Sequence, residues 1–473
     1  MCVRLAGNLF KTSDFMQCQK LILAVSGGGD SLALLFLVKE HLKTLSVPPE
    51  MIAVTVDHQL RKESACEAET VAKICRAHHI KHIILRWEGK KPKTHIASSA
   101  RVARYNLLFK EAQKQGATLI MTGHTLNDQV ETYQMRYQRF QKSIAALQRE
   151  TVGGKCEGEC STEIEENITQ KNYGLMYRRG LSCIPREALL RRKVRLIRPL
   201  LGVKRKTLRA YLRLKGKTWI DDPTNEDLSF ERVRVRQSLH KKNFTTIAQR
   251  AYEATLQRRQ FAQDIADLIL ALDVAVEYGR CFIAKPAPFL QQHSGFPFVV
   301  GLFAVLMGGG GYLLPSQKLI TLFQKLHLYS SEKQRFTFAG SVIEYSRSGI
   351  AFWRESRNMK EAVIEPGKTF LWDGRYQITN HESNAIKVGA AGLEQLKSLS
   401  QTSTFNIENP HFPSLQSLLM VSNDKGWDIP ELTYQAVFHP NVVIKRIMAP
   451  FHWLLSHEDA VFVNVVEPFF ILR

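Results

Sequence analysis

Paired cysteines are missing from this 473-residue chain. Its eight cysteines are scattered and contain no C-x-x-C pair, the spacing typical of zinc and iron–sulfur sites, so no such site is expected. Cys156 and Cys160 stand in a C-x-x-x-C arrangement within a polar, acidic segment, which is a weak metal signal. Dispersed thiols fit a reducing compartment, and we therefore expect a cytoplasmic protein.

Long apolar runs are also lacking. Residues Met1 to Gln17 mix polar and charged side chains without an apolar core of signal-peptide length, so export is not expected. The longest uncharged stretch, Phe296 to Pro315, is interrupted by Pro297 and by glycines at 301 and 308–311. It predicts a short buried helix that ends in a turn, and not a membrane span.

Acidic residues are the third shortage: 44 Asp and Glu stand against 65 Lys and Arg, giving a net charge of +21. The excess is local, because residues 186–242 hold 18 Lys or Arg, most of them Arg, against 6 Asp or Glu. Arginine suits phosphate contacts better than a general solubility role requires. This pattern predicts a polyanionic partner, nucleic acid before an anionic membrane surface.

The most informative motif is Ser-Gly-Gly-Gly-Asp-Ser at residues 26–31, between the apolar runs Leu21–Val25 and Leu32–Val38. This order predicts a strand, a glycine-rich turn and a helix, whose backbone N–H groups and positive dipole end can bind phosphate. Its members are Ser26, Gly27, Gly28, Gly29, Asp30 and Ser31. Both serine hydroxyls can donate to phosphate oxygens, while Asp30 requires a cation such as Mg²⁺ between itself and the phosphates.

Two commoner phosphate loops do not fit this motif. The P-loop requires a lysine that is absent here, and the dinucleotide-binding G-x-G-x-x-G pattern fails because Ser31 and Leu32 follow Asp30. The remaining form resembles the S-G-G-x-D-S pyrophosphate loop of the ATP pyrophosphatase superfamily, which implies ATP cleaved between its α and β phosphates. A glycine-rich turn without a ligand is the alternative.

The first two hundred residues alternate short apolar runs with helical patterns. Strands are predicted at 21–25, 51–56, 82–85 and 118–122, and helices at 32–42, 65–78 and 101–115. This succession is typical of an α/β fold with a Rossmann-like parallel sheet, in which ligands gather at the carboxyl ends of the strands.

Composition divides the rest of the chain. Residues 141–172 are polar with little periodicity and predict a long loop or insertion, while 203–214 predict a basic helix and 219–225 a turn. A helical domain is predicted from 244 to about 328, and strand-rich segments at 370–388 and 461–472. We therefore expect a catalytic domain at 1–222, a mainly helical domain at 223–356 and a small β-containing domain at 357–473.

Two groups of polar residues follow predicted strands. Asp57, after the second strand, is able to hold a ribose or a metal, although an aspartate that starts a turn is an equal alternative. In a helix, His124, Asp128 and Glu131 would stand at i, i+4 and i+7 on one face. Such a face can bind a metal or an ammonium group or transfer protons; a solvated helix face is the alternative.

These residues together resemble the tRNA(Ile)-lysidine synthase family of the PP-loop superfamily. The similarity includes the motif at 26–31, Val56-Asp57-His58, residues 100–105, His124 to Thr132, Arg198-Pro199-Leu200-Leu201 and Asp222-Pro223-Thr224-Asn225, followed by Arg232, Arg234 and Arg236. It is specific over residues 21–236 and weaker beyond 240, where the chain looks similar to the family's accessory tRNA-binding domains.

The resemblance implies an enzyme that uses ATP and Mg²⁺ to join L-lysine to carbon 2 of the wobble cytidine in the CAU anticodon of isoleucine tRNA, through an adenylated base. Asp30, which would also hold the metal, Asp128, Glu131 and His124 are then the expected catalytic residues. ATP is expected at residues 26–31 and Asp57. The expected tRNA ligands are Arg198, Arg232, Arg234 and Arg236.

The chain departs from the family pattern at three places. Asn127 stands where an aspartate is usual, residues 139–177 form an insertion, and Val233 replaces an asparagine between the arginines. The alternatives are a tRNA thiolase, an RNA-binding protein with a relict nucleotide fold, and an ATP-dependent amidotransferase. The absence of C-x-x-C argues against the first, the intact loop against the second, and the lack of a glutaminase signature near Cys2 against the third.

Overall fold

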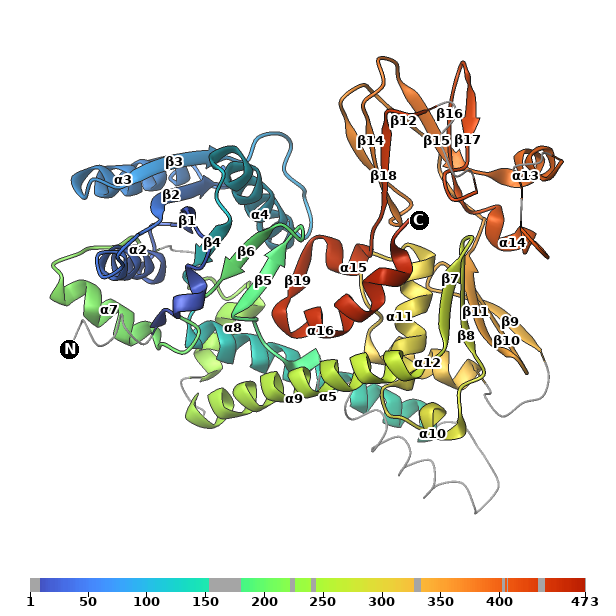
Figure 1. Ribbon diagram of the computed structural model, residues 1–473. Helices are drawn as coiled ribbons and strands as arrows, with labels where there is room; N and C mark the ends of the chain where they lie inside the picture. Colours follow the sequence, from blue (N-terminus) through green and yellow to red (C-terminus); the bar gives the residue numbers. More distant parts are fainter. Residues whose placement is uncertain are drawn as a thin grey trace. The chain divides into compact units, whose positions relative to one another are not determined.

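The computed structural model describes residues 9–152, 180–221, 226–239, 244–326, 333–401, 405, 407–432 and 439–472. The chain forms two compact units (Figure 1). Unit 1 comprises Met1–Glu150, Leu181–Leu256 and Leu454–Glu458, and unit 2 comprises Thr151–Gly180, Gln257–Trp453 and Asp459–Arg473. The three-domain division at 222 and 356 stays a prediction.

Unit 1 is built on a seven-stranded sheet in the order β19-β5-β6-β4-β1-β2-β3. The four strands predicted in the first part of the chain are confirmed as β1 (Lys20–Ala24), β2 (Glu50–Asp57), β3 (Lys81–Arg86) and β4 (Leu119–Thr122). They run parallel, as does β6 (Val194–Ile197) beside β4. Among the described strands of this sheet, the antiparallel pairings are those of β5 (Glu187–Leu190) with β6 and of β19 (Leu454–Ser456) with β5. The predicted α/β class is therefore confirmed.

Helices cover both faces of this sheet. The strand order runs outward from β1 to β3 and then returns to β4, so right-handed crossovers place α4 (Ile96–Gln115) on the face opposite to α2 (Gly29–Leu42) and α3 (Ser64–Ala77). The fully apolar stretch Leu32–Val38 of α2 is buried in a core that also includes side chains of α3 and α7 (Arg205–Leu214). A helix apolar all round is expected where it is buried on every side.

The sheet has a topological switch point between β1 and β4. From β1 the chain proceeds to β2 on one side, whereas β4 lies on the other side of β1. In doubly wound sheets the crevice at such a point, outside the carboxyl ends of the strands, receives the ligand. The motif at 26–31 follows β1, and His124 follows β4, so both lie at this crevice.

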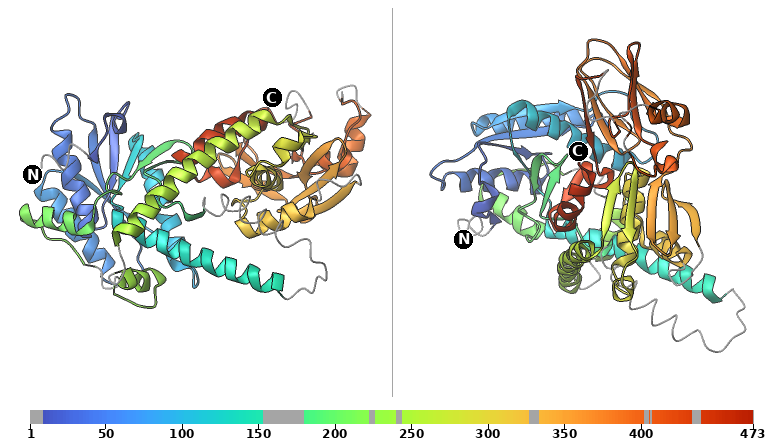
Figure 2. Two further views of the ribbon diagram at one scale, coloured as in Figure 1. Left: turned by 90° about the horizontal axis from the view of Figure 1, so that it is seen from below. Right: turned by 45° about the vertical axis from the view of Figure 1, so that its right-hand side comes forward.

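Helix α5 (Leu126–Val152) corrects one expectation. The segment from 141 was expected to be a loop, yet its first part continues α5 to Val152 (Figure 2). Residues 141–152 include Ala, Leu, Gln, Lys and Arg, which favour helix even without a marked apolar face. The rest of the expected insertion, 153–177, lies outside the described residues, as does the Asp222 to Asn225 part of the predicted turn.

The described residues of unit 2 form three antiparallel sheets. The five-stranded sheet consists of β7 (Val274–Glu277), β8 (Arg280–Ala284), β9 (Gln334–Phe338), β10 (Ser341–Ser346) and β11 (Gly349–Arg354). The four-stranded sheet consists of β12 (Ala362–Ile364), β15 (Ile386–Ala390), β16 (Leu419–Asn423) and β17 (Gly426–Asp428), and the three-stranded one of β13 (Thr369–Trp372), β14 (Tyr376–Asn380) and β18 (Val442–Arg446). Residues of the two smaller sheets share one core that includes Trp372, Tyr376 and Val388.

The remaining described helices are short except for α9 (Phe244–Ala271), which links α8 (Glu231–Leu239) to unit 2. Helix α11 (Phe296–Gly308) packs on the five-stranded sheet and ends at Gly309 with a φ of +71°, which confirms the predicted buried helix and its turn. The others are α10 (Pro288–Gln291), α12 (Ser316–Lys325), α13 (Gly392–Ser400), α14 (Phe412–Leu415), α15 (Ala449–His452) and α16 (His457–Val466), with 3₁₀ turns at Thr12–Asp14 and Glu467–Phe470.

Two predictions in unit 2 are wrong. The segment expected to be helical from Phe244 to Leu328 contains the β7–β8 hairpin, whose turn residues Tyr278 and Gly279 have φ values of +46° and +73°. Residues 461–472, expected as strand, form most of α16 and a 3₁₀ turn. Valines favour strand by local preference, but Phe462, Val463 and Val466 are buried at a helical spacing, and this packing overrides the preference.

Within the described part of the chain, no helix is both long enough and apolar enough to cross a membrane.

Candidate active site

The glycine-rich loop joins β1 to α2, as predicted, and its serines hold it together. Ser31 Oγ donates to the carbonyl of Gly28 at 2.9 Å and accepts from the backbone N–H of Ser26 at 3.2 Å. The two hydroxyl oxygens lie 3.3 Å apart. Gly27 has a φ of +88°, a conformation that side chains rarely adopt. The loop therefore has a defined shape with its backbone close to the first turn of α2.

Neighbouring segments pack against this loop. Ile220 donates its N–H to the carbonyl of Gly27 at 3.0 Å, and a Cβ on Gly27 would lie 2.8 Å from Ile220 Cδ1. On the β4 side, a Cβ on Gly123 would lie 3.0 Å from both the carbonyl oxygen of Asp30 and the Cα of Ser31. The lack of a side chain at Gly123 thus favours the close approach of the β4 end to the N-terminus of α2.

Asp30 lies at the start of α2 and forms an ion pair with an arginine that the sequence did not single out. Its Oδ2 accepts from Arg205 Nε at 2.9 Å, whereas Oδ1 is buried without a hydrogen-bond partner. Burial raises the pKa of Asp30, and the Arg205 guanidinium opposes that rise only in part. A buried carboxylate oxygen without a donor is suited to accept a cation.

The β4 end corrects the helical prediction for His124. Helix α5 begins at Leu126, so His124 lies in the preceding turn, and only Asp128 and Glu131 share a helix face, at i and i+3. The Oγ1 of Thr122 lies 2.9 Å from His124 Nδ1. Burial, together with the positive charge of Arg198 nearby, lowers the pKa of His124, so its imidazole is neutral at neutral pH.

Asp128 connects the fold of α5 to the site. Its Oδ2 accepts from the backbone N–H and the hydroxyl of Thr125, at 2.7 and 2.8 Å, and so caps the helix. Its Oδ1 accepts from Arg232 Nη2 at 2.8 Å and from Arg205 Nη2 at 3.4 Å. Burial raises the pKa of Asp128, but Arg232, with His124 and Arg205, outweighs burial and holds it below its usual value.

Glu131 is almost fully buried, with 1% of its side chain exposed. Its Oε2 accepts from Arg232 Nε at 2.7 Å and its Oε1 from Arg236 Nε at 2.8 Å. Arg205 Nη1 lies 3.6 Å from Oε1. A carboxylate at this depth requires charge partners, and three guanidinium groups supply them.

The structure therefore brings together three carboxylates, Asp30, Asp128 and Glu131, and three arginines, Arg205, Arg232 and Arg236. Arg205 contacts all three carboxylates and links the phosphate loop to α5. Burial alone would lower the pKa of Arg205, but the charges of Asp30 and Asp128 raise it by more than burial lowers it. The guanidinium therefore stays protonated.

Sequence reasoning missed Arg205 and the role of Asn127 beside it. Arg205 lies at the start of the predicted basic helix, where nothing distinguished it from neighbouring cations. Asn127 accepts the backbone N–H of Arg205 at 2.9 Å and thereby fixes the start of α7 against the start of α5. The only available signal was that Asn127 occupies a position where an aspartate is usual in similar sequences.

The other predicted residues lie apart from this cluster. Asp57 is buried at the end of β2, where its Oδ1 accepts from the N–H of Gln59 at 2.9 Å and from Ser64 Oγ at 2.7 Å, as a turn-forming aspartate does. Beside it, burial and the charge of Arg104 lower the pKa of His58 to about 4.

The four predicted tRNA ligands have different surroundings. Arg198 is only 1% exposed and donates to the carbonyl of Pro185 at 2.7 Å, which is an interior position. Arg232 and Arg236 face the carboxylates, whereas Arg234 is exposed and donates to the carbonyls of Leu228 and Ser229. Among the described residues, no group of three or more His, Cys, Asp and Glu side chains is arranged to hold a metal ion.

Comparisons with known proteins give consistent similarities. A PP-loop domain model matches residues 3–157 and 169–243. The tRNA(Ile)-lysidine synthase of Bartonella quintana is 76% identical over 473 residues, covering 100% of this chain and 99% of that protein. The tRNA(Ile)-lysidine synthase of Brucella suis is 33% identical over 469 residues, covering 97% of this chain and 96% of that protein. A solved structure of a U34-tRNA thiolase from Methanococcus maripaludis with its [4Fe-4S] cluster covers 54% of this chain and 76% of its own, with 16% identity and a TM-score of 0.37.

Proposed function

Because the chain belongs to the tRNA(Ile)-lysidine synthase family, we propose that the cluster around Arg205 is the site where it forms lysidine on tRNA(Ile). The chain is an ATP-dependent ligase of this family. The observation that carries the assignment is the approach of the phosphate loop and the start of α5 at the switch point, with Arg205 bridging Asp30 to Asp128 and Glu131. A thiolase is not favoured, because the curated relatives carry the lysidine synthase name.

The proposed reaction has two steps. The carbonyl oxygen of the wobble cytidine in the CAU anticodon attacks the α-phosphate of ATP, which forms an adenylated base and releases pyrophosphate. The side-chain amine of L-lysine then attacks carbon 2 of the base and displaces AMP. We place this reaction in the cytoplasm, in line with the dispersed cysteines of the chain.

The loop at 26–31 would bind the phosphates that leave as pyrophosphate. The N-terminus of α2 lies in this loop, and the Ser26 hydroxyl could turn from Ser31 to a phosphate, whereas the Ser31 hydroxyl donates to the Gly28 carbonyl and holds the loop in shape. Such groups stabilise the negative charge that develops on the leaving group, because they are already oriented before the reaction. Asp30 would hold Mg²⁺ through its unpartnered Oδ1, and the metal would supply further charge neutralisation.

Asp128 and Glu131 are the proposed lysine-binding residues. Their oxygens already accept hydrogen bonds from arginines, but a carboxylate has about four acceptor positions, so capacity for an amine remains. We propose that they orient the amine or accept its proton, and the lowered pKa of Asp128 favours the orienting role for that residue. His124 would contact a phosphate as a neutral hydrogen-bond donor through Nε2, with Nδ1 accepting from Thr122.

Separate measurement of the two steps tests these roles. Transfer of labelled AMP to a tRNA(Ile) transcript without lysine reports adenylation, and lysidine formation reports the second step. In the variants Asp128→Ala and Glu131→Ala, we expect lysine-dependent turnover to fall at least about 100-fold. The adenylation step should fall much less.

Glu88→Gln is the matched control, because Glu88 is an exposed carboxylate of unit 1 outside the cluster, and it should retain wild-type turnover. Near-normal lysine-dependent turnover in both Ala variants would remove Asp128 and Glu131 from the mechanism.

A further inference from the structure

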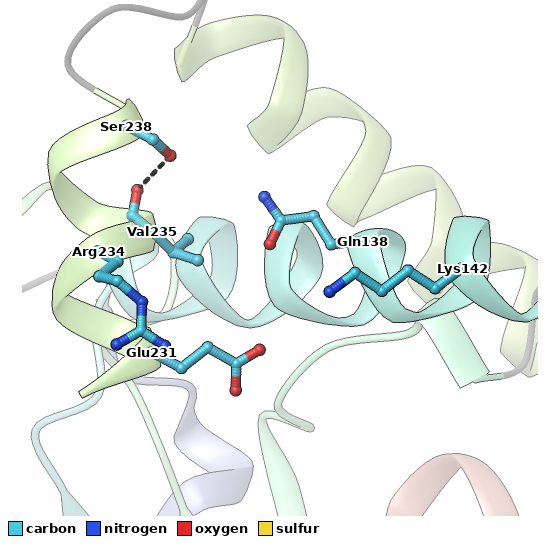
Figure 3. A pocket seen from close by; sticks show the side chains of 6 residues that line it. All are labelled: Gln138, Lys142, Glu231, Arg234, Val235 and Ser238. Atoms are coloured by element: carbon cyan, nitrogen blue, oxygen red, sulfur yellow. Dashed lines mark hydrogen bonds between the residues drawn. The ribbon is translucent and has the colours of Figure 1, made fainter. Parts of the chain in front are cut away.

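A pocket of about 360 Å³ lies between α5 and α8, on unit 1 (Figure 3). Its lining side chains are Gln138, Lys142, Glu231, Arg234, Val235 and Ser238. Gln138 and Lys142 extend from α5 toward α8, and Arg234 and Glu231 lie at the facing end of α8 (Figure 3). Nothing in the proposed mechanism uses this pocket.

Helix α8 has two chemically different faces. Arg232 and Arg236 are four residues apart, so they lie on one face, and both are neutralised by Asp128 or Glu131. Arg234, between them, points away from that face and lines the pocket. Within the described residues, no carboxylate lies at ion-pair distance from Arg234 or from Lys142, and Arg234 Nη1 donates only to the carbonyls of Leu228 and Ser229.

The one acidic side chain in the pocket is compensated from outside it. Glu231 Oε2 lies 2.5 Å from Arg139 Nη2, and both groups are partly exposed. This ion pair leaves Lys142 and Arg234 as a local excess of two positive charges, with the Gln138 amide as an additional donor. Ammonium, guanidinium and amide N–H groups that line one pocket match an oxyanion, and a guanidinium is well suited to phosphate.

We propose that this pocket binds a backbone phosphate of the tRNA substrate, with Lys142 and Arg234 as its charged ligands; the inference rests on the proposed function. A volume of about 360 Å³ leaves room for a phosphate group. Helix α8 then contacts the tRNA through one face and the catalytic carboxylates through the other. This site would position the RNA next to the adenylation centre without reading its sequence.

The test uses the full-length protein and a tRNA(Ile) transcript with a CAU anticodon. In the double variant Lys142→Gln/Arg234→Gln, we expect KM for tRNA to rise about 10-fold near 100 mM salt, and the dependence of log affinity on log salt to become shallower by about one to two. KM for ATP should stay at the wild-type value. The charge-preserving variant Lys142→Arg/Arg234→Lys should remain within about threefold of wild type for tRNA.

The matched control is Lys110→Gln/Lys114→Gln, which removes the same charge from two exposed positions on α4. An equal loss of tRNA affinity in this control would show a general charge effect and overturn the proposal. A rise in KM for ATP without a rise for tRNA would assign the pocket to the nucleotide and also overturn it. Failure of the proposed function itself is distinguishable, because the wild type would then form no lysidine at all.

Discussion

Arg205 forms charge contacts with all three carboxylates of the site. Its side chain is 20% exposed, and it lies within 4 Å of Asp30, Asp128 and Glu131, of which the last is 1% exposed. Removing one cation from a partly buried network leaves its partners insufficiently compensated, which costs more than loss of a surface ion pair. Arg205 therefore stabilises the site as well as connecting its two halves.

The variant Arg205→Ala should unfold about 2–4 kcal/mol more easily at pH 7.5, a range set below the largest values for buried pairs because Arg205 is partly exposed. Burial already raises the pKa of Asp30, and loss of Arg205 would raise it further. The variant's native state then binds protons at a higher pH than its unfolded state does. Its stability deficit should therefore be complete at neutral pH and shrink as pH falls toward 5.

Urea unfolding at pH 7.5 and pH 5 measures this effect. Lys206→Ala is the control, because it removes an exposed cation from the next position of the same helix and should change stability by less than about 0.5 kcal/mol. A deficit for Arg205→Ala that is independent of pH, or no larger than that of the control, would contradict this account of Arg205.

At the scale of elements, the glycines after α11 show how unit 2 is held together. Gly309 has a φ of +71°, and a Cβ on it would lie 2.0 Å from the carbonyl oxygen of Asp373, in the β13–β14 turn. Asp373 in turn accepts from Arg354 at the end of β11 and from Arg375 at the start of β14. Backbone contact and ion pairs thus connect α11, the five-stranded sheet and the three-stranded sheet.

Gly309→Ala should destabilise unit 2 by more than about 2 kcal/mol, because it combines a left-handed conformation with an overlap against backbone. Gly311→Ala is the matched control: a Cβ there meets no atom within 4 Å, and the change should be nearly neutral. Thermal unfolding of both variants checks the difference. Equal unfolding midpoints for the two variants would show that the backbone around Gly309 shifts easily to make room for a Cβ.

Elements were predictable from the sequence where local pattern and burial agree. Strands β1 to β4 and helices α2 to α4 follow from apolar runs alternating with helical patterns. The loop at 26–31 identified the carboxyl ends of the strands as the place of the site. The β7–β8 hairpin was missed because its turn, Tyr278-Gly279, is not one of the strongest hairpin signals. Helix α16 was missed because its valines favour strand until tertiary packing is known.

Parts of the site depend on contacts between residues far apart in the chain. Arg205 and Asp30 are 175 residues apart, and Arg236 and Glu131 are 105 apart. The residue types were visible in the sequence, but which cation pairs with which carboxylate is decided by the packing of α7 and α8 against the start of α5. Position in the basic stretch alone did not separate Arg234 from Arg232.

At the scale of the whole molecule, the basic excess is distributed unevenly between internal and external roles. Several arginines of residues 186–242 are used inside unit 1: Arg186 with Asp14, Arg195 with Glu187, and Arg205 with Asp30. The sequence count of +12 in this segment therefore overstates the charge available to an external phosphate. Arg234 is one of the basic residues that have no carboxylate partner among the described residues.

We propose that this chain joins lysine to a cytidine of tRNA(Ile) at the expense of ATP. Incubation with ATP, L-lysine and a tRNA(Ile) transcript bearing a CAU anticodon, followed by mass analysis of the digested nucleosides, tests it most directly. We expect a cytidine whose mass has increased by one lysine less one water, with AMP and pyrophosphate as products. An unmodified cytidine, or a nucleoside that has gained sulfur in place of lysine, would contradict it.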